Sequence, residues 1–192
     1  MGSAKEREDA AIPSLMGTNC IFALGGSSKS GKTTLGRRFA EELGVRFASF
    51  GDYVRKEAAR RGITNASSAE LQAVGLSLVT SDLVKFCQSV LTDAGFVPGE
   101  GLVIDGVRHL DAVRVLKNLV GEQPLKVIYL DSSLAVRRQR GSFTAHNLDT
   151  IDSHPVEAET QSVKNIADFV LDTSLLTPDD CLGRLQSWVR LS

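Results

Sequence analysis

The chain has 192 residues, of which 42% are hydrophobic and 23% are charged, and its formal net charge is −1. These values are typical of one soluble globular domain with ample apolar material for a core. The balanced charge argues against nucleic acid as the main partner, because nucleic-acid binding usually requires a basic excess.

Other features of the sequence indicate the cellular compartment of the protein and its contacts with membranes and metals. Residues 1–18 lack the pattern of a secretory signal, and we expect a flexible N-terminal tail there. No apolar run approaches the length needed to cross a bilayer, so we expect no membrane contact. The three cysteines form no CxxC pair, which argues against zinc and favours a reducing compartment. We expect a cytoplasmic monomer or homodimer with a single domain over residues 19–192.

Short apolar runs alternate with helical patterns along that domain, which predicts an α/β fold. We expect three layers, α/β/α, with helices on both sides of a five-stranded and mostly parallel sheet. The expected strands are 20–24, 46–50, 102–104, 125–130 and 169–171.

The helical patterns fall between these strands. Asp52 is a candidate start for the helix that follows the second strand. Residues 66–94 predict two helices, with Ser81 and Asp82 as their junction and cap. Thr177 is the expected cap of the last helix, because a proline and two acidic residues follow it.

The strongest motif is a glycine-rich stretch with the pattern G-x-x-x-x-G-K-T, from Gly26 to Thr33. It lies between an expected strand and an expected amphipathic helix, where its backbone N–H groups and the helix N-terminus form a cradle for anions. Lys32 would reach the β- and γ-phosphates of a nucleotide, and the Thr33 hydroxyl would hold Mg²⁺. The expected cofactors are therefore ATP and Mg²⁺. The candidate nucleotide-binding residues are Gly26, Ser27, Ser28, Lys29, Ser30, Gly31, Lys32, Thr33 and Thr34.

Lys29 departs from the usual pattern of this loop, because many kinase loops carry glycine at that position. One interpretation is a solvated side chain on the outer side of the loop. The other interpretation is an additional contact with phosphate.

Charged residues follow three further strands, at the sheet edge where open α/β sheets bind ligands. With the phosphate loop, they make residues 21–189 resemble the nucleoside-monophosphate kinase group of P-loop kinases, which includes adenylate, cytidylate and dephospho-coenzyme A kinases. The resemblance implies a helical acceptor-binding insertion over about 52–96 and a lid over about 134–155. The stretches that carry it are Phe50-Gly51-Asp52-Tyr53-Val54-Arg55, Ile104-Asp105-Gly106-Val107-Arg108, Leu130-Asp131-Ser132-Ser133 and Ala167-Asp168-Phe169-Val170-Leu171-Asp172.

The resemblance also implies roles for five charged residues. Asp105 would hold Mg²⁺ through water, although an aspartate there could instead cap a helix. Arg137 and Arg140 share a face if residues 134–140 are helical and would then cover the γ-phosphate; a solvated basic face is the alternative. Arg55 and Arg108 would bind a phosphate of the acceptor, or else form surface ion pairs.

The role of Asp52 depends on the chemical class of the acceptor. A phosphate acceptor needs no base, whereas a hydroxyl acceptor gains from a carboxylate that takes its proton. Asp52 is either that base or the cap of its helix. The lid region also departs from the group, because it lacks a clear second arginine pair and carries His146 and His154 as loop residues instead.

The leading hypothesis is an ATP-dependent kinase that transfers phosphate to a small molecule, with a nucleoside monophosphate or a similar nucleotide as the first candidate. The second hypothesis is a kinase of a hydroxyl acceptor that uses Asp52 as base. The third is an ATP-binding regulatory module without catalysis.

Overall fold

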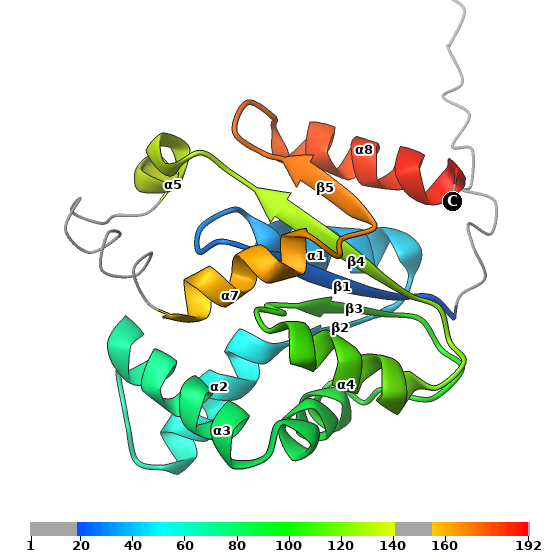
Figure 1. Cartoon of the computed structure of the whole chain (residues 1–192). Coiled ribbons are helices and arrows are strands. Elements are labelled where there is room, and N and C mark those ends of the chain that lie inside the picture. The colour runs from blue at the N-terminus through cyan, green and yellow to red at the C-terminus, as the bar shows by residue number, and fades with distance from the viewer. Residues whose placement is uncertain (1–18, 141–154, 192) are drawn as a thin grey trace, which may run out of the picture.

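A computed structural model describes residues 19–140 and 155–191 of the chain (Figure 1). Its centre is a five-stranded sheet with the order β2-β3-β1-β4-β5, in which every neighbouring pair is parallel. The strands are β1 (Ile21–Gly26), β2 (Arg46–Ser49), β3 (Leu102–Asp105), β4 (Leu125–Asp131) and β5 (Phe169–Asp172). The expected α/β/α fold with a five-stranded parallel sheet is thereby confirmed.

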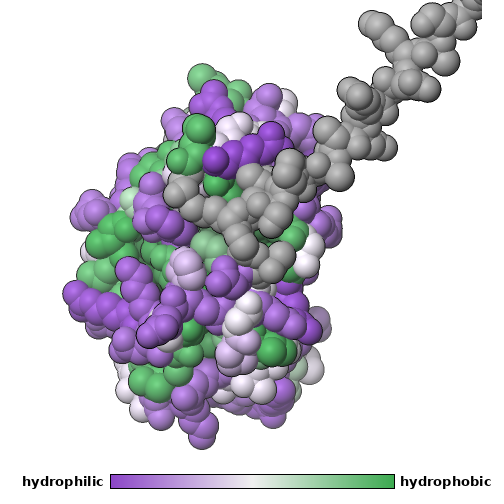
Figure 2. Space-filling view, turned by 90° about the vertical axis from the view of Figure 1, so that its right-hand side faces the viewer, coloured by the Kyte–Doolittle hydropathy of each residue, from purple (hydrophilic) through white to green (hydrophobic). Residues whose placement is uncertain are grey.

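Helices cover both faces of the sheet (Figure 1). The helices are α1 (Lys32–Leu43), α2 (Phe50–Arg60), α3 (Ser68–Asp93), α4 (Leu110–Val120), α5 (Leu134–Arg140), α7 (Pro155–Lys164) and α8 (Pro178–Leu191). Seen from the side in Figure 2, the surface is mostly hydrophilic, with hydrophobic side chains in small groups between the polar ones.

The core divides into two clusters because successive residues of a strand point to opposite faces. Ile21 and Ala23 of β1 pack in the cluster that includes residues of α2, α3 and α4. Phe22 and Leu24 pack in the other cluster, with residues of α1 and α8. The sheet is therefore buried on both faces, which fixes the loops at the carboxyl ends of its strands as the places where a site can form.

The first residues of α8 and α2 can be compared with the helix caps expected from the sequence. Thr177 caps α8 as expected, since its hydroxyl accepts a hydrogen bond of 3.1 Å from the backbone N–H of Asp180. The prediction that Asp52 starts α2 is wrong: the helix begins at Phe50, and the Ser49 hydroxyl caps it by accepting from the Asp52 N–H. Asp52 instead lies in the first helical turn, where the positive end of the helix dipole stabilises its negative charge.

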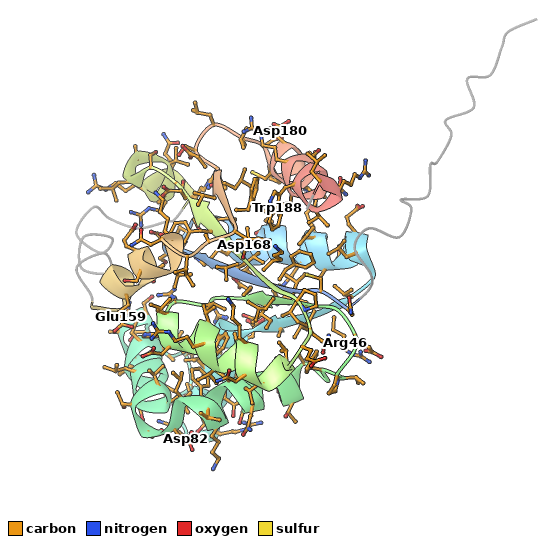
Figure 3. All side chains as sticks on the ribbon, turned by 45° about the vertical axis from the view of Figure 1, so that its right-hand side comes forward. Arg46, Asp82, Glu159, Asp168, Asp180 and Trp188 are labelled. Carbon is orange, nitrogen blue, oxygen red and sulfur yellow. The ribbon has the colours of Figure 1, made fainter. Side chains whose placement is uncertain are left out.

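The long helix α3 is broken in its middle. Asp82 has non-helical backbone angles, φ −165° and ψ 93°, and its carboxylate accepts a hydrogen bond of 2.8 Å from the Lys85 N–H. The predicted junction and cap at this point are confirmed, and Figure 3 shows Asp82 on the outer side of the helical region.

One described helix, α3, is long and apolar enough to cross a membrane by length and composition alone. Its most apolar 18-residue window has a mean hydropathy of 1.3, and 28% of that window is buried. The helix is interrupted at Asp82 and packs against α2 and α4. This is weak evidence for a membrane span, since core helices of soluble proteins reach the same values.

Candidate active site

The phosphate loop connects β1 to α1 and is fixed by two glycines. Gly26 has φ 137°, and a Cβ there would lie 2.3 Å from the carbonyl oxygen of Leu130 in β4. Gly31 has φ 95° and precedes the first residue of α1. Both positions lie in the region of backbone space that glycine alone enters without strain, so the glycines of the motif allow the loop to curl directly against the sheet.

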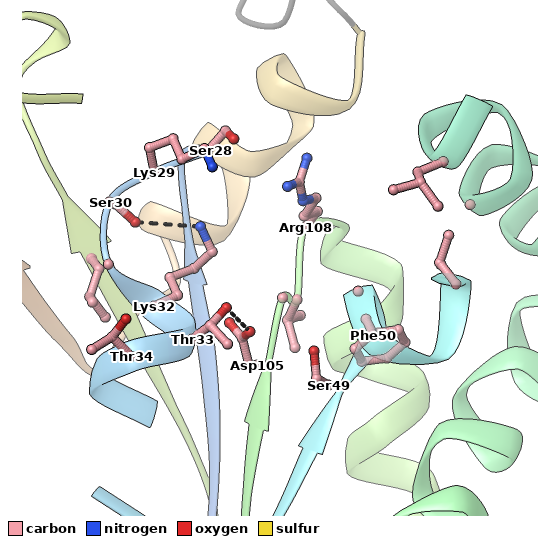
Figure 4. Close-up of a pocket in the computed structure, with 18 of the residues that line it drawn as sticks. Ser28, Lys29, Ser30, Lys32, Thr33, Thr34, Ser49, Phe50, Asp105 and Arg108 are labelled. Atoms are coloured by element: carbon pink, nitrogen blue, oxygen red, sulfur yellow. Dashed lines mark hydrogen bonds between the residues drawn. The ribbon is translucent and has the colours of Figure 1, made fainter. Parts of the chain in front are cut away.

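Lys32 folds back over the loop (Figure 4). Its ammonium group donates a hydrogen bond of 2.6 Å to the Ser27 carbonyl oxygen and lies 3.4 Å from the Ser30 hydroxyl. The side chain is only 8% exposed, so its charge lies inside the loop, where the β- and γ-phosphates of a nucleotide would be.

Lys29 adopts a left-handed backbone conformation, with φ 63°. This explains why glycine is usual at the position, because a side chain in that region costs about 1 kcal/mol. Lys29 also lines the main cavity of the structure, together with Ser28 and Ser30.

Thr33 and Asp105 are brought together at the centre of the site. The Thr33 hydroxyl donates a hydrogen bond of 2.6 Å to Asp105 Oδ2. Asp105 is 4% exposed, and its Oδ1 has no hydrogen-bond partner among the described residues. A buried carboxylate oxygen beside a hydroxyl suits a hard cation such as Mg²⁺, which prefers oxygen ligands. The helix-cap alternative for Asp105 is excluded, because α4 begins at Leu110 and His109 occupies its cap position.

The arginines of α5 contact the phosphate loop from the other side. Arg137 is buried, and its guanidinium lies 3.5 Å from the Ser28 carbonyl oxygen. Arg140 donates to the hydroxyl and the carbonyl oxygen of Thr173 at 2.9 and 2.6 Å, and it lies 3.4 Å from the Ser30 carbonyl oxygen. The burial of Arg137 argues against a solvated basic face at that residue, whereas Arg140 is exposed although it makes these contacts. Residues 141–154 of the expected lid, with His146 and His154, lie outside the described residues.

A cavity of about 700 Å³ extends from the phosphate loop to α2 and α3. Arg55 and Arg108 line it, as do Asp105 and Arg140, so the structure brings the phosphate loop and the candidate acceptor arginines to one space. In Figure 4, Arg108 points into the gap between the loop and α2.

Asp52 is placed elsewhere. Within the described part of the chain it does not line this cavity but a second one of about 400 Å³, beside Arg37 and Lys56. Its carboxylate accepts hydrogen bonds of 2.6 Å from Arg37 and 2.7 Å from Arg55. The structure therefore links Asp52 to Arg55, one of the two candidate acceptor arginines, and does not place it among the described residues that line the cavity beside the phosphate loop.

Three further residues at the site were not predicted from the sequence. Thr173 is 3% exposed and holds Arg140; it directly follows β5, so the rule that ligands bind at strand ends could have found it. His109 lines the cavity and forms a hydrogen bond with Glu159 of α7, a contact that no sequence signal indicates. Figure 3 labels Glu159 on α7.

Electrostatic contacts also fix α7 beside the site. The Lys164 ammonium donates a hydrogen bond of 2.6 Å to Asp131 at the end of β4, and this bond raises the pKa of Lys164. Farther along the cavity, burial raises the pKa of the Cys181 thiol, so that side chain stays neutral there.

The sheet order, the phosphate loop and the arginines of α5 together define a P-loop kinase of the nucleotide-kinase type. Residues 25–154 match the family model described as an AAA domain, and the chain belongs to that family. The expected resemblance to P-loop nucleotide kinases is thereby confirmed, and the expectation of an ATP-dependent kinase agrees with it.

The chain is also similar in sequence to proteins of other organisms. A UPF0200 protein of Pyrobaculum aerophilum is 36% identical over 122 residues, which cover 62% of this chain and 63% of that protein. The match thus spans less than two thirds of that relative's length. An adenylate kinase of Synechococcus sp. is 27% identical over 84% of this chain and 90% of its own.

A solved structure with the same architecture is the shikimate kinase from Acinetobacter baumannii in complex with shikimate. Its TM-score is 0.58, with 16% identity and coverage of 92% of this chain and 95% of that chain. This likeness shows the shared fold.

Proposed function

We propose that the protein transfers the γ-phosphate of ATP, with Mg²⁺, to a small-molecule acceptor that already carries a phosphate group. The observation that carries the proposal is the shared cavity, which joins the phosphate loop and Asp105 to Arg55 and Arg108. Nucleoside monophosphates are the first acceptors to test, since an adenylate kinase is among the relatives.

The donor half of the site would hold ATP through the loop backbone and Lys32. Mg²⁺ would be held by the Thr33 hydroxyl and Asp105, and when bound it would neutralise charge on the phosphates. Arg140 reaches the loop from α5 and lines the cavity, so it is placed to stabilise charge on the transferring group. Arg137 would support the loop through the Ser28 carbonyl.

The acceptor half supports a substrate that is already an anion. Arg55 and Arg108 can each bind phosphate oxygens with two N–H groups. A phosphate acceptor needs no base, which agrees with the absence of Asp52 from the described lining of the cavity. The hydroxyl-acceptor alternative has less support, because Asp52 already pairs with two arginines.

A regulatory module without turnover is the other alternative. It does not explain why one cavity continues from the phosphate loop to two arginines on the acceptor side. A phosphotransfer screen tests the proposal: purified protein, ATP, Mg²⁺ and a panel of nucleoside monophosphates, nucleosides, dephospho-coenzyme A and simple organic phosphates, followed by ADP release. ADP formation with a phosphorylated acceptor supports the proposal, whereas ADP formation with hydroxyl compounds alone contradicts it.

A further inference from the structure

The acceptor half of the main cavity is apolar. Between the two helices that form it, α2 and α3 contribute the side chains of Val54, Leu71, Leu76, Val79, Leu83 and Phe86. Among the described lining residues of these helices, the polar side chains are Arg55, Ser68 and Gln72. Most of the surface that an acceptor would touch there is therefore hydrocarbon.

Helix α3 is more apolar than its burial in the fold explains. The window with mean hydropathy 1.3 is 28% buried, whereas helices of this character in soluble proteins are usually covered by other elements. Leu76 shows the consequence, because it is 44% exposed and lines the cavity. Exposed apolar surface inside a cavity is the mark of a ligand-binding wall.

Two arginines also line this space, which the phosphate loop and Asp105 line as well. Arg108 follows β3 and points into the gap between the phosphate loop and α2 (Figure 4). Arg55 lines the cavity from α2 and is held at 2.7 Å by Asp52. An occupant that complements both parts has an anionic group toward the phosphate loop and an apolar body toward α3.

We infer that the acceptor is an organic monophosphate with an apolar body, such as an alkyl, prenyl or aryl monophosphate. The inference rests on the proposed function and narrows its substrate class. A nucleoside monophosphate carries several hydrogen-bonding groups on its sugar and base. Each one buried without a partner costs about 1–3 kcal/mol. Among the described residues that α3 contributes to the cavity, the polar side chains are Ser68 and Gln72.

The transfer step balances without a base. An anionic oxygen of the acceptor phosphate forms a bond to the γ-phosphorus of ATP. The bond from that phosphorus to the β–γ bridging oxygen breaks, and its electron pair leaves with ADP. The product is the diphosphate ester of the apolar alcohol.

Two variants of α3 test whether its apolar residues bind the acceptor or are merely exposed on the surface. Leu76→Gln changes a residue that is 44% exposed and lines the cavity, whereas Val84→Gln changes one that is 47% exposed and is not among the described lining residues. Both residues are partly solvated, so both variants should fold, which a thermal unfolding curve checks.

The binding experiment is calorimetric titration of geranyl monophosphate, and separately of AMP, CMP, GMP and UMP, into protein saturated with a non-hydrolysable ATP analogue and Mg²⁺. We expect geranyl monophosphate to bind at least tenfold more tightly than any of the four nucleotides. Leu76→Gln should weaken that binding about three- to tenfold, and Val84→Gln should leave it unchanged. Tighter binding of a nucleotide, or equal losses in the two variants, would overturn the inference.

Two further measurements, phosphate transfer and co-sedimentation with vesicles, distinguish failure of this inference from failure of the proposed function. Preferred phosphate transfer to a nucleoside monophosphate would overturn the inference and leave the proposed function standing. Binding of geranyl monophosphate with no transfer from ATP to any acceptor would overturn the proposed function. Co-sedimentation with phosphatidylcholine vesicles that both variants reduce equally would assign the apolar surface of α3 to membrane contact and overturn the inference as well.

Discussion

The Thr33 hydroxyl donates a 2.6 Å hydrogen bond to Asp105, which joins the first turn of α1 to the end of β3. Because β1 and β3 are neighbours and Leu24 is in register with Asp105, the sheet holds these two side chains together. The buried Oδ1 of the same carboxylate has no partner among the described residues, so it is available to a water on a metal ion.

Asp105→Asn should abolish most metal-dependent activity while the fold survives. The amide is isosteric and still accepts the Thr33 hydrogen bond, but it lacks the negative charge that attracts Mg²⁺. We expect kcat to fall about 100-fold or more and the Mg²⁺ concentration for half-maximal rate to rise. Steady-state rates across a Mg²⁺ series measure both. Thr33→Ser keeps the hydroxyl and serves as the matched control with small losses; an unchanged Mg²⁺ dependence in Asp105→Asn contradicts the metal role.

Lys29→Gly separates the two interpretations of this unusual loop residue. Relief of the left-handed backbone at φ 63° should stabilise the protein by about 1 kcal/mol, which thermal unfolding measures. If the side chain also contacts phosphate, the Kd for ATP should rise about three- to tenfold in the same variant. A raised unfolding temperature with unchanged ATP affinity would leave Lys29 as a solvated residue.

Asp52→Asn should affect acceptor binding more than the chemical step. The carboxylate orients Arg55 and ties it to Arg37 of α1, but it is not among the described residues that line the main cavity. We expect the acceptor KM to rise about three- to tenfold, with kcat within about threefold of the wild type. Asp93→Asn is the matched control, since Asp93 lies in the same smaller cavity and pairs with Lys56 instead. A kcat loss of about 100-fold in Asp52→Asn would restore the base hypothesis.

The buried thiols predict how stability depends on pH. Burial raises the pKa of Cys87 to about 12 and that of Cys20 to about 11, from an ordinary value of 9.0. Above pH 9 the unfolded chain releases these protons and the folded chain keeps them, so stability falls as the pH rises toward the folded-state values. Urea unfolding at pH 8, 9 and 10 measures the decline. Cys87→Ala should flatten its slope, and an unchanged slope would contradict the assignment.

The sequence predicted most of the framework because the signals are local. Apolar runs marked the strands, the glycine motif marked the phosphate loop, and Ser81-Asp82 marked the break in α3. The start of α2 could not be decided in that way, since Ser49 and Asp52 are both good helix-capping residues within four positions.

The contacts between distant residues could not be predicted. Arg37 reaches Asp52 only because α1 packs against β2, the strand that leads into α2. Arg140 reaches Thr173 only because β4 and β5 are paired. The apolar wall of the cavity is likewise a property of packing: α3 carries many apolar residues, and only the fold shows which of them face the cavity.

Transfer of labelled γ-phosphate from ATP to a phosphorylated acceptor, by the wild type and by Lys32→Ala, tests the central claim most directly. The account predicts a labelled diphosphate product with the wild type. It predicts a rate at least about 100-fold lower for Lys32→Ala, with the fold intact by circular dichroism, because this buried ammonium lies within the phosphate loop. Full activity of Lys32→Ala, or a wild type that binds ATP and labels no acceptor in the panel, would contradict it.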